Sequence, residues 1–182
     1  MEIFLIRHTR PAIEKGICYG QTDLPLASSF EKELTAVRKN IPKNINFQSV
    51  FSSPLKRCKE LAIGLFGNHI KEDQRLMELD FGDWEMKPWN EIPEKELNPW
   101  MSDFVHTSCP NGESYHELSA RGIDFLNDLN KLPAGPIAIV THAGPIRAIH
   151  AYVNNIALKD SFDLKVDYGE IIKLQLENVQ SI

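Results

Sequence analysis

The sequence contains few cysteines and lacks the common metal-binding motifs. Its 182 residues include three cysteines, Cys18, Cys58 and Cys109, and no C-x-x-C pair. An odd number of cysteines without such a pair fits neither a disulfide framework nor a zinc ribbon. Because H-E-x-x-H is absent as well, we expect neither a metal nor a cofactor.

Long apolar runs and an excess of positive charge are also missing. No stretch approaches the roughly 20 apolar residues of a membrane-spanning helix, and the N-terminus lacks the basic segment of a signal peptide. The chain has 25 acidic and 20 basic residues, a net charge of −5 that disfavours binding to a phosphate polymer. We therefore expect a cytoplasmic protein that binds neither nucleic acid nor membranes. This average charge still allows a small cationic pocket.

The motifs of several enzyme classes do not occur. The sequence has neither of the glycine-rich nucleotide-binding loops, G-x-G-x-x-G and G-x-x-x-x-G-K-[ST], and it has no G-x-S-x-G of a serine hydrolase. Cysteine nucleophiles are weak candidates, since Cys58 falls on the apolar face of a predicted helix and is expected in the core.

Apolar runs alternate with segments of helical period, which favours an α/β fold. Residues 3–6 and 137–140 are uninterrupted apolar runs, typical of strands buried on both faces of a parallel sheet. Residues 50–51 indicate a short strand, a weaker one falls within 69–77, and alternation over 172–176 indicates an edge strand. We predict three layers, with helices on both faces of a mainly parallel sheet.

Serine residues mark the starts of several predicted helices. A serine followed three residues later by glutamate forms a capping box, and a serine before proline is typical of an N-cap and first helical position. These starts are Ser28 with Glu31, Ser53 with Pro54, and Ser114 with Glu117. A further helix is predicted to open at Gly144-Pro145.

Residues 83–112 have no clear period and are rich in tryptophan and proline. Long segments of this kind inside a compact domain are often lids or binding loops. We predict that residues 1–182 form a single domain, with 83–112 as an aromatic-rich lid inserted in it.

Polar side chains follow three of the predicted strands. Arg7 and His8 come directly after the first strand, Arg57 lies just after the second, and His142 follows the 137–140 strand. Because parallel strands end at one edge of a sheet, we expect these residues to meet there. Two predicted helices also begin at this edge, and helix N-termini attract anions. The sequence therefore predicts a site for one phosphoryl group.

Each of these residues has an ordinary structural interpretation when taken alone. Arg7 and Arg57 are typical solvated surface charges, and single histidines such as His8 and His142 are more often hydrogen-bonded structural residues. Their shared placement at strand ends favours the functional interpretation. Neighbouring arginines also disfavour a bound cation.

Five sequence blocks, in this order, resemble the histidine phosphatase superfamily and, within it, the phosphoglycerate-mutase-like branch. Together they span most of the chain. They are Leu5-Ile6-Arg7-His8-Thr9, Ser52-Ser53-Pro54-Leu55-Lys56-Arg57, Leu76-Met77-Glu78-Leu79-Asp80-Phe81-Gly82-Asp83-Trp84-Glu85, Gly112-Glu113-Ser114 and Val140-Thr141-His142-Ala143-Gly144.

The resemblance implies a role for each strand-end residue. His8 would be the nucleophile that forms a phosphohistidine, while Arg7, Arg57 and His142 would bind the phosphoryl oxygens. Glu78 would protonate the leaving oxygen and then activate water. Without the resemblance, Glu78 would be interpreted as a solvated loop carboxylate.

The loop over residues 16–26 further resembles that of superfamily members that act as α-ribazole phosphatases in cobalamin assembly. This resemblance implies a small phosphorylated metabolite as the partner. The implied substrate contacts are Tyr19, Gly20, Gln21, Trp84 and Ala143. The tryptophans of the lid would stack on the flat base of the substrate, although they are as well suited to packing the lid onto the body.

The chain departs from the family pattern near the phosphate. Thr9 stands where a glycine is common, and Glu14 lies near a position where many members have an asparagine that contacts phosphate. A carboxylate there would repel substrate unless it is turned away. Three alternatives stay open: a broad-specificity sugar- or nucleotide-phosphate phosphatase, a phosphoglycerate mutase, and a non-catalytic module.

Overall fold

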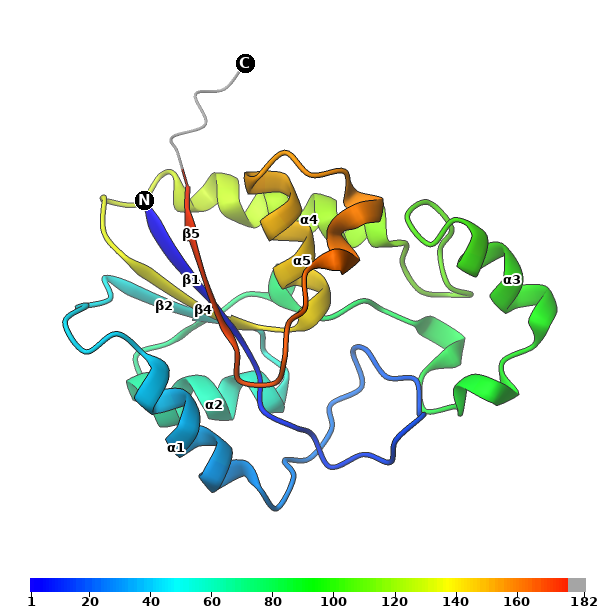
Figure 1. Cartoon of the computed structure of the whole chain (residues 1–182), viewed down its shortest axis with the longest axis horizontal. Coiled ribbons are helices and arrows are strands. Elements are labelled where there is room, and N and C mark those ends of the chain that lie inside the picture. Colours follow the sequence, from blue (N-terminus) through cyan, green and yellow to red (C-terminus); the bar gives the residue numbers. More distant parts are fainter. Residues whose placement is uncertain (177–182) are drawn as a thin grey trace.

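A five-stranded sheet forms the middle layer of the computed structural model, which describes residues 1–176 (Figure 1). The strands are β1 (Glu2–Arg7), β2 (Ser49–Ser52), β3 (Lys71–Glu72), β4 (Ile137–Thr141) and β5 (Ile171–Gln175). Their order across the sheet is β3-β2-β4-β1-β5. Only β5, an edge strand, runs antiparallel to its neighbour, β1. The predicted fold class is confirmed, and the strand expected within 69–77 is the two-residue β3.

The two central strands are the apolar runs that the sequence predicts as buried strands. Ile3 pairs with Ile137 and Arg7 with Thr141, so β1 and β4 run in register and end together. Side chains alternate between the faces: Leu5 packs in one core cluster and Ile6 in the other. Burial on both sides explains why these segments are apolar without interruption.

Helices cover both faces of the sheet (Figure 1). One face carries α1 (Phe30–Asn40) and α2 (Lys56–Phe66), and the other carries α4 (Tyr115–Leu129) and α5 (Ala143–Val153). The first pair buries Leu34, Val37 and Leu61 against the sheet, and the second pair buries Phe125, Leu126 and Ile146. None of the helices in residues 1–176 has the length and apolar character to cross a membrane.

Of the three helix starts predicted at serines, one is correct and two are shifted, and the helix predicted to open at Gly144-Pro145 begins one residue earlier, at Ala143. Ser114 and Glu117 form the predicted capping box at the start of α4. Helix α1 instead follows Ser29, whose hydroxyl donates to Glu33 at 2.6 Å rather than capping the backbone. Helix α2 begins at Lys56, because Ser53 and the residue after it belong to the turn that leaves β2.

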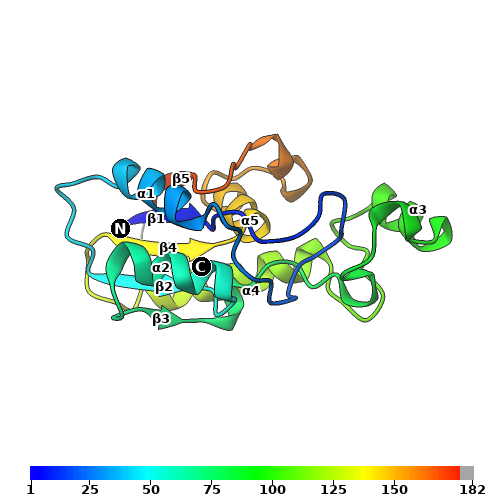
Figure 2. The same ribbon diagram turned by 90° about the horizontal axis from the view of Figure 1, so that it is seen from below.

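The segment 83–112 lies away from the sheet, at one end of the molecule, and α3 (Glu94–Ser102) is its outermost part (Figure 2). It also contains the 3-10 turn η3 (Trp89–Glu91), and η2 (Gly82–Trp84) leads into it. The remaining 3-10 turns are η1 (Gln74–Leu76) and η4 (Leu158–Asp163). Trp84, Ile92, Cys18 and Cys109 form a core cluster of their own in this part, so the segment has its own apolar support.

Candidate active site

The ends of β1 and β4 bring the two predicted site histidines together. His8 follows β1 and His142 follows β4, and their ring centroids lie 4.9 Å apart. Both side chains are buried. The sequence-based expectation that strand ends would gather these residues agrees with this geometry.

The backbone fixes the tautomer of His8. Its Nδ1 lies 2.6 Å from the carbonyl oxygen of Thr9, and a carbonyl can only accept, so Nδ1 carries the proton. The lone pair is therefore on Nε2. Burial, with Arg57 and Arg7 nearby, holds the pKa of His8 well below its usual value. His8 is thus a neutral imidazole with a free nucleophilic nitrogen.

Arg7 lines the site with part of its hydrogen-bonding capacity unused. One terminal nitrogen, Nη1, donates to the carbonyl of Val166 at 2.6 Å. Its Nε is buried and has no hydrogen-bond partner within residues 1–176. An unpartnered buried N–H is costly, and a bound oxyanion would satisfy it.

Arg57 and His142 form a buried layer beside His8. Arg57 Nε donates to His142 Nδ1 at 3.3 Å, which leaves the proton of His142 on Nε2 for the Ser53 hydroxyl, 2.8 Å away. Burial and the charge of Arg57 keep the pKa of His142 well below its usual value. Cys58 Sγ also lies 3.3 Å from Nε2. Ser53, predicted as a helix cap, therefore orients His142.

The carboxylate of Glu78 accepts two backbone hydrogen bonds. Leu79 N–H donates at 3.0 Å, and Gly144 N–H, in the first turn of α5, donates at 3.3 Å. A Cβ atom at position 144 would come within 2.2 Å of Glu78 Oε1, so the close approach requires glycine. The N-terminus of α5 is thus occupied by Glu78. The N-terminus of α2 likewise donates, through Lys56 N–H, to Asp23 at 2.7 Å. At each of these two helix N-termini, one backbone N–H is therefore already paired with a carboxylate of this chain.

Arg121 on α4 holds the backbone that carries Glu78. Its guanidinium donates to the carbonyl oxygens of Arg75, Met77 and Glu78 at 2.6–2.9 Å. The same group forms an ion pair with Glu113 at 2.6 Å. Rigid support of this kind fixes where a catalytic carboxylate can reach.

Gly20 and Gln21, which the sequence predicts as substrate contacts, do not line the cavity and instead support its side. The carbonyl of Gly20 accepts from Arg57 at 2.5 Å, and the Gln21 amide donates to the Glu78 carbonyl at 3.1 Å. A Cβ at Gly20 would overlap the Leu79 carbonyl at 1.8 Å, so this position also requires glycine. The Glu85 carboxylate fixes the 16–26 loop by accepting a hydrogen bond from the backbone N–H of Gln21 at 2.7 Å.

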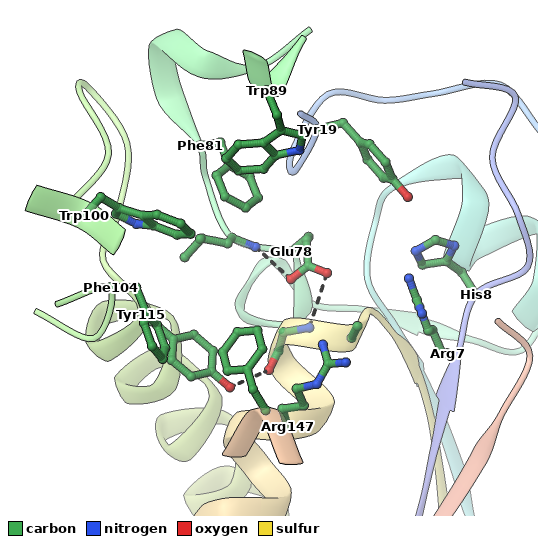
Figure 3. Close-up of a pocket in the computed structure, with 14 residues that line it drawn as sticks. Arg7, His8, Tyr19, Glu78, Phe81, Trp89, Trp100, Phe104, Tyr115 and Arg147 are labelled. Atoms are coloured by element: carbon green, nitrogen blue, oxygen red, sulfur yellow. Dashed lines mark hydrogen bonds between the residues drawn. The ribbon is translucent and has the colours of Figure 1, made fainter. Parts of the chain in front are cut away.

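A cavity of about 310 Å³ opens next to His8 (Figure 3). Arg7, His8 and Tyr19 lie at one side, Glu78 lies between, and aromatic rings form the opposite wall. The rings are those of Phe81, Trp89, Trp100, Phe104, Tyr115 and Phe162. Ala143, Gly144, Leu79 and Arg147 complete the lining. The cavity therefore joins a polar, cationic end to an apolar aromatic wall.

Trp84 and Glu14 lie outside this cavity. Trp84 is only 1% exposed and packs edge-on against Trp100 with ring centroids 5.7 Å apart, while its indole donates to Glu96 at 3.1 Å. The expectation that it contacts substrate is therefore corrected: it packs the 83–112 segment internally. Glu14 is exposed and does not line the cavity, so its carboxylate does not face the cationic end.

Sequence reasoning missed Tyr115, Phe162, Arg147 and Tyr168. Arg147 is the one cation among the buried apolar residues of α5, one turn after Gly144, and that signal was available. Tyr115 directly follows the capping Ser114, and its hydroxyl lies 2.9 Å from Ser161. Nothing in the local sequence of Phe162 or Tyr168 indicates that either approaches the site.

The three cysteines are structural. All are buried and free, and burial raises the pKa of Cys18 and Cys109 to about 12 and that of Cys58 above its usual value. Thiols held neutral in this way are poor nucleophiles. Within residues 1–176, no group of three or more His, Cys, Asp or Glu residues is arranged to hold a metal ion.

The lowered pKa values of both histidines predict loss of stability in acid. Below about pH 6.5, histidines of the unfolded chain bind protons that buried His8 and His142 do not. The free energy of unfolding should therefore fall as the pH decreases, by up to about 1.4 kcal/mol per pH unit for each histidine. Urea unfolding between pH 7.5 and 5.5 measures this slope. The His142→Gln variant should show a shallower slope, and an unchanged slope would contradict the assignment.

Sequence comparison with known proteins points to phosphatases, in agreement with the geometry of the site. The model of the histidine phosphatase superfamily (branch 1) matches residues 3–181. Adenosylcobalamin/alpha-ribazole phosphatase of Escherichia coli is 25% identical over 93% of this chain and 87% of its own. Metal-independent phosphoserine phosphatase of Arabidopsis thaliana is 30% identical over 82% of this chain and 67% of its own.

Solved structures share the fold. The alpha-ribazole phosphatase from Shigella flexneri superposes with a TM-score of 0.88 at 23% identity, covering 97% of this chain and 91% of the other. The resemblance that the five sequence blocks indicate is therefore confirmed. This chain belongs to branch 1 of the histidine phosphatase superfamily and is a phosphatase.

Proposed function

We propose that the protein hydrolyses α-ribazole 5′-phosphate to α-ribazole and phosphate through a phosphohistidine, in assembly of the cobalamin nucleotide loop. The observation that carries the proposal is the two-part cavity. Its cationic end, with Arg7 and His8, suits a phosphate dianion, and its wall of six aromatic rings suits a flat base. The similarity to proteins named as α-ribazole phosphatases supports the same substrate.

In the first step, His8 Nε2 attacks the phosphorus atom and the P–O ester bond breaks. The free lone pair on Nε2 and the proton held on Nδ1 by Thr9 prepare this attack. Glu78 acts as the general acid and donates a proton to the departing alkoxide oxygen. Arg7, with its unpartnered Nε, binds a phosphoryl oxygen, and the buried guanidinium of Arg57, held by His142, adds positive charge beside His8.

In the second step, water attacks the phosphohistidine. Glu78, now a carboxylate, takes a proton from the water, the P–N bond breaks, and the electron pair returns to His8 Nε2. Phosphate leaves and the starting enzyme is restored. The chain's own residues perform each of these roles without a metal, which agrees with the name of the metal-independent plant relative.

Arg147 favours a second candidate, an amino-acid phosphate such as phosphoserine. Its guanidinium lines the cavity beside the Phe162 ring, 5.0 Å from the ring centroid, and its one side-chain hydrogen bond within residues 1–176 goes to the Leu164 carbonyl at 3.0 Å. A carboxylate on the leaving group would pair with it. The plant relative carries phosphoserine in its name.

A substrate panel separates these candidates. We expect kcat/KM for α-ribazole 5′-phosphate to exceed that for ribose 5-phosphate by about 10- to 100-fold, the contribution of stacking one base on aromatic rings. Phosphoserine and glucose 6-phosphate complete the panel. Comparable kcat/KM values for all four would indicate a broad-specificity phosphatase. A clear preference for phosphoserine would move the assignment to amino-acid phosphates, and isomerisation of a phosphoglycerate without phosphate release would indicate a mutase.

A further inference from the structure

The turn that precedes β5, residues 166–170, is hydrogen-bonded to the C-terminal end of β1. Arg7 N–H donates to the Glu170 carbonyl at 3.0 Å, and Gly169 N–H lies 3.2 Å from the carbonyls of both Arg7 and His8. Gly169 has a φ of +74°, a conformation that favours glycine. The turn is thereby fixed to the two residues that do the phosphoryl chemistry.

The same turn contacts the guanidinium of Arg7 in two ways. The Val166 carbonyl accepts from Arg7 Nη1 at 2.6 Å, and the ring of Tyr168 lies over the guanidinium, with 3.9 Å between Cζ and the ring centroid. The Tyr168 ring centroid is also 5.6 Å from that of His8. Together, the carbonyl and the ring restrict how the guanidinium plane can turn.

Tyr168 also contacts the 16–26 loop, which carries Tyr19. Its hydroxyl lies 2.8 Å from the hydroxyl of Tyr19, which lines the cavity. The Tyr19 ring in turn faces the second site arginine, with Arg57 Cζ 5.6 Å from its centroid. One hydrogen bond thus joins two rings, and each ring contacts one of the two arginines.

We propose that Tyr168 is a positioning residue, which acts through Arg7: its ring holds the guanidinium plane in the orientation that binds the phosphoryl oxygens, and its hydroxyl, through Tyr19, ties this support to Arg57. The inference rests on the proposed roles of Arg7 and His8. It does not depend on which leaving group the enzyme accepts.

The physical reason is the freedom of an arginine side chain. Arginine has four rotatable bonds, and a guanidinium that binds an oxyanion at two points must present its plane at one angle. Without the ring, Arg7 keeps only the Val166 carbonyl as a fixed side-chain partner within the described residues. Small displacements of a positioned catalytic group reduce rate by up to about 100-fold.

Three variants test the ring and the hydroxyl separately, with p-nitrophenyl phosphate as substrate. Tyr168→Phe keeps the ring and should lose about threefold in kcat/KM. Tyr168→Leu removes it and should lose about 10- to 100-fold. Tyr168→Gln, also without a ring, replaces the leucine variant if that variant does not fold, because Tyr168 is 36% exposed and a polar side chain is tolerated there. Inhibition by orthovanadate should weaken in parallel with kcat/KM.

A double-mutant cycle with Arg7→Lys distinguishes positioning from a purely structural role. Lysine has no guanidinium plane, so removing the Tyr168 ring in that background should cost less than threefold. An equal loss in both backgrounds, or a Tyr168→Leu enzyme as active as Tyr168→Phe, would overturn the inference. Failure of the wild-type enzyme to hydrolyse any phosphate ester would instead overturn the proposed function.

Discussion

Replacement of His8 by alanine should reduce phosphatase turnover by more than about a thousandfold, because the imidazole Nε2 is the proposed nucleophile and we expect no second nucleophile to take its place. The other histidine of the site, His142, has its nitrogens directed at Arg57 and Ser53. The cysteine thiols are buried. The variant should also fail to incorporate acid-labile phosphate from a labelled substrate, measured after rapid quenching in alkali.

The exposed His116 provides a matched control. His116→Ala removes the same side chain outside the cavity and should keep wild-type turnover and labelling. Labelled phosphate that persists in His8→Ala would identify another nucleophile. In the same assay EDTA should leave wild-type activity intact, and inhibition that an added divalent metal reverses would reinstate a metal-dependent reaction.

Replacement of Glu78 by glutamine should have the second large effect, and its size should depend on the leaving group. Glutamine cannot donate a proton, so the loss for an alkyl phosphate should be about 100- to 10,000-fold in kcat/KM. Nitrophenolate is a far weaker base than an alkoxide. Phosphorylation of His8 by p-nitrophenyl phosphate should therefore lose much less.

With this aryl substrate, hydrolysis of the phosphohistidine should become rate-limiting, because the second step has lost its base. Stopped-flow absorbance should show a burst of about one equivalent of nitrophenolate per enzyme, together with accumulated phosphohistidine. Glu91→Gln, an exposed position on η3, is the control. Equal losses for alkyl and aryl substrates, without a burst, would mean that Glu78 is not the proton donor.

The sheet and its supporting helices follow from local sequence patterns. Residues 3–6 and 137–140 are apolar because both faces of the sheet are covered by helices. Each apolar run therefore predicts a doubly buried strand without reference to the rest of the chain. His8 and His142 directly follow these strands, so both lie at the same edge of the sheet. Strand periodicity and parallel topology therefore predict the cationic end of the cavity.

The supports of the site could not be predicted in the same way. Ser53 has the local sequence of a helix cap, but its hydroxyl is bonded to His142, a residue far along the chain. Trp84 has the local sequence expected of an aromatic that contacts substrate, but it is packed inside the 83–112 segment. Both outcomes depend on contacts between segments that are far apart in the sequence. A local sequence pattern indicates only whether a residue suits its own helix, strand or turn.

The cavity's two halves rest on different parts of the chain. Arg7 and His8, the residues proposed to react, lie at the end of a sheet strand, while Trp89 and Trp100 belong to the 83–112 segment, and Phe162, 52% exposed, belongs to η4. Under the proposed function, exchanges among these rings should therefore alter which ester is accepted without moving His8. Divergence of specificity within such a scaffold, and its redesign in the laboratory, would begin at Phe162, where a new side chain displaces the least packing.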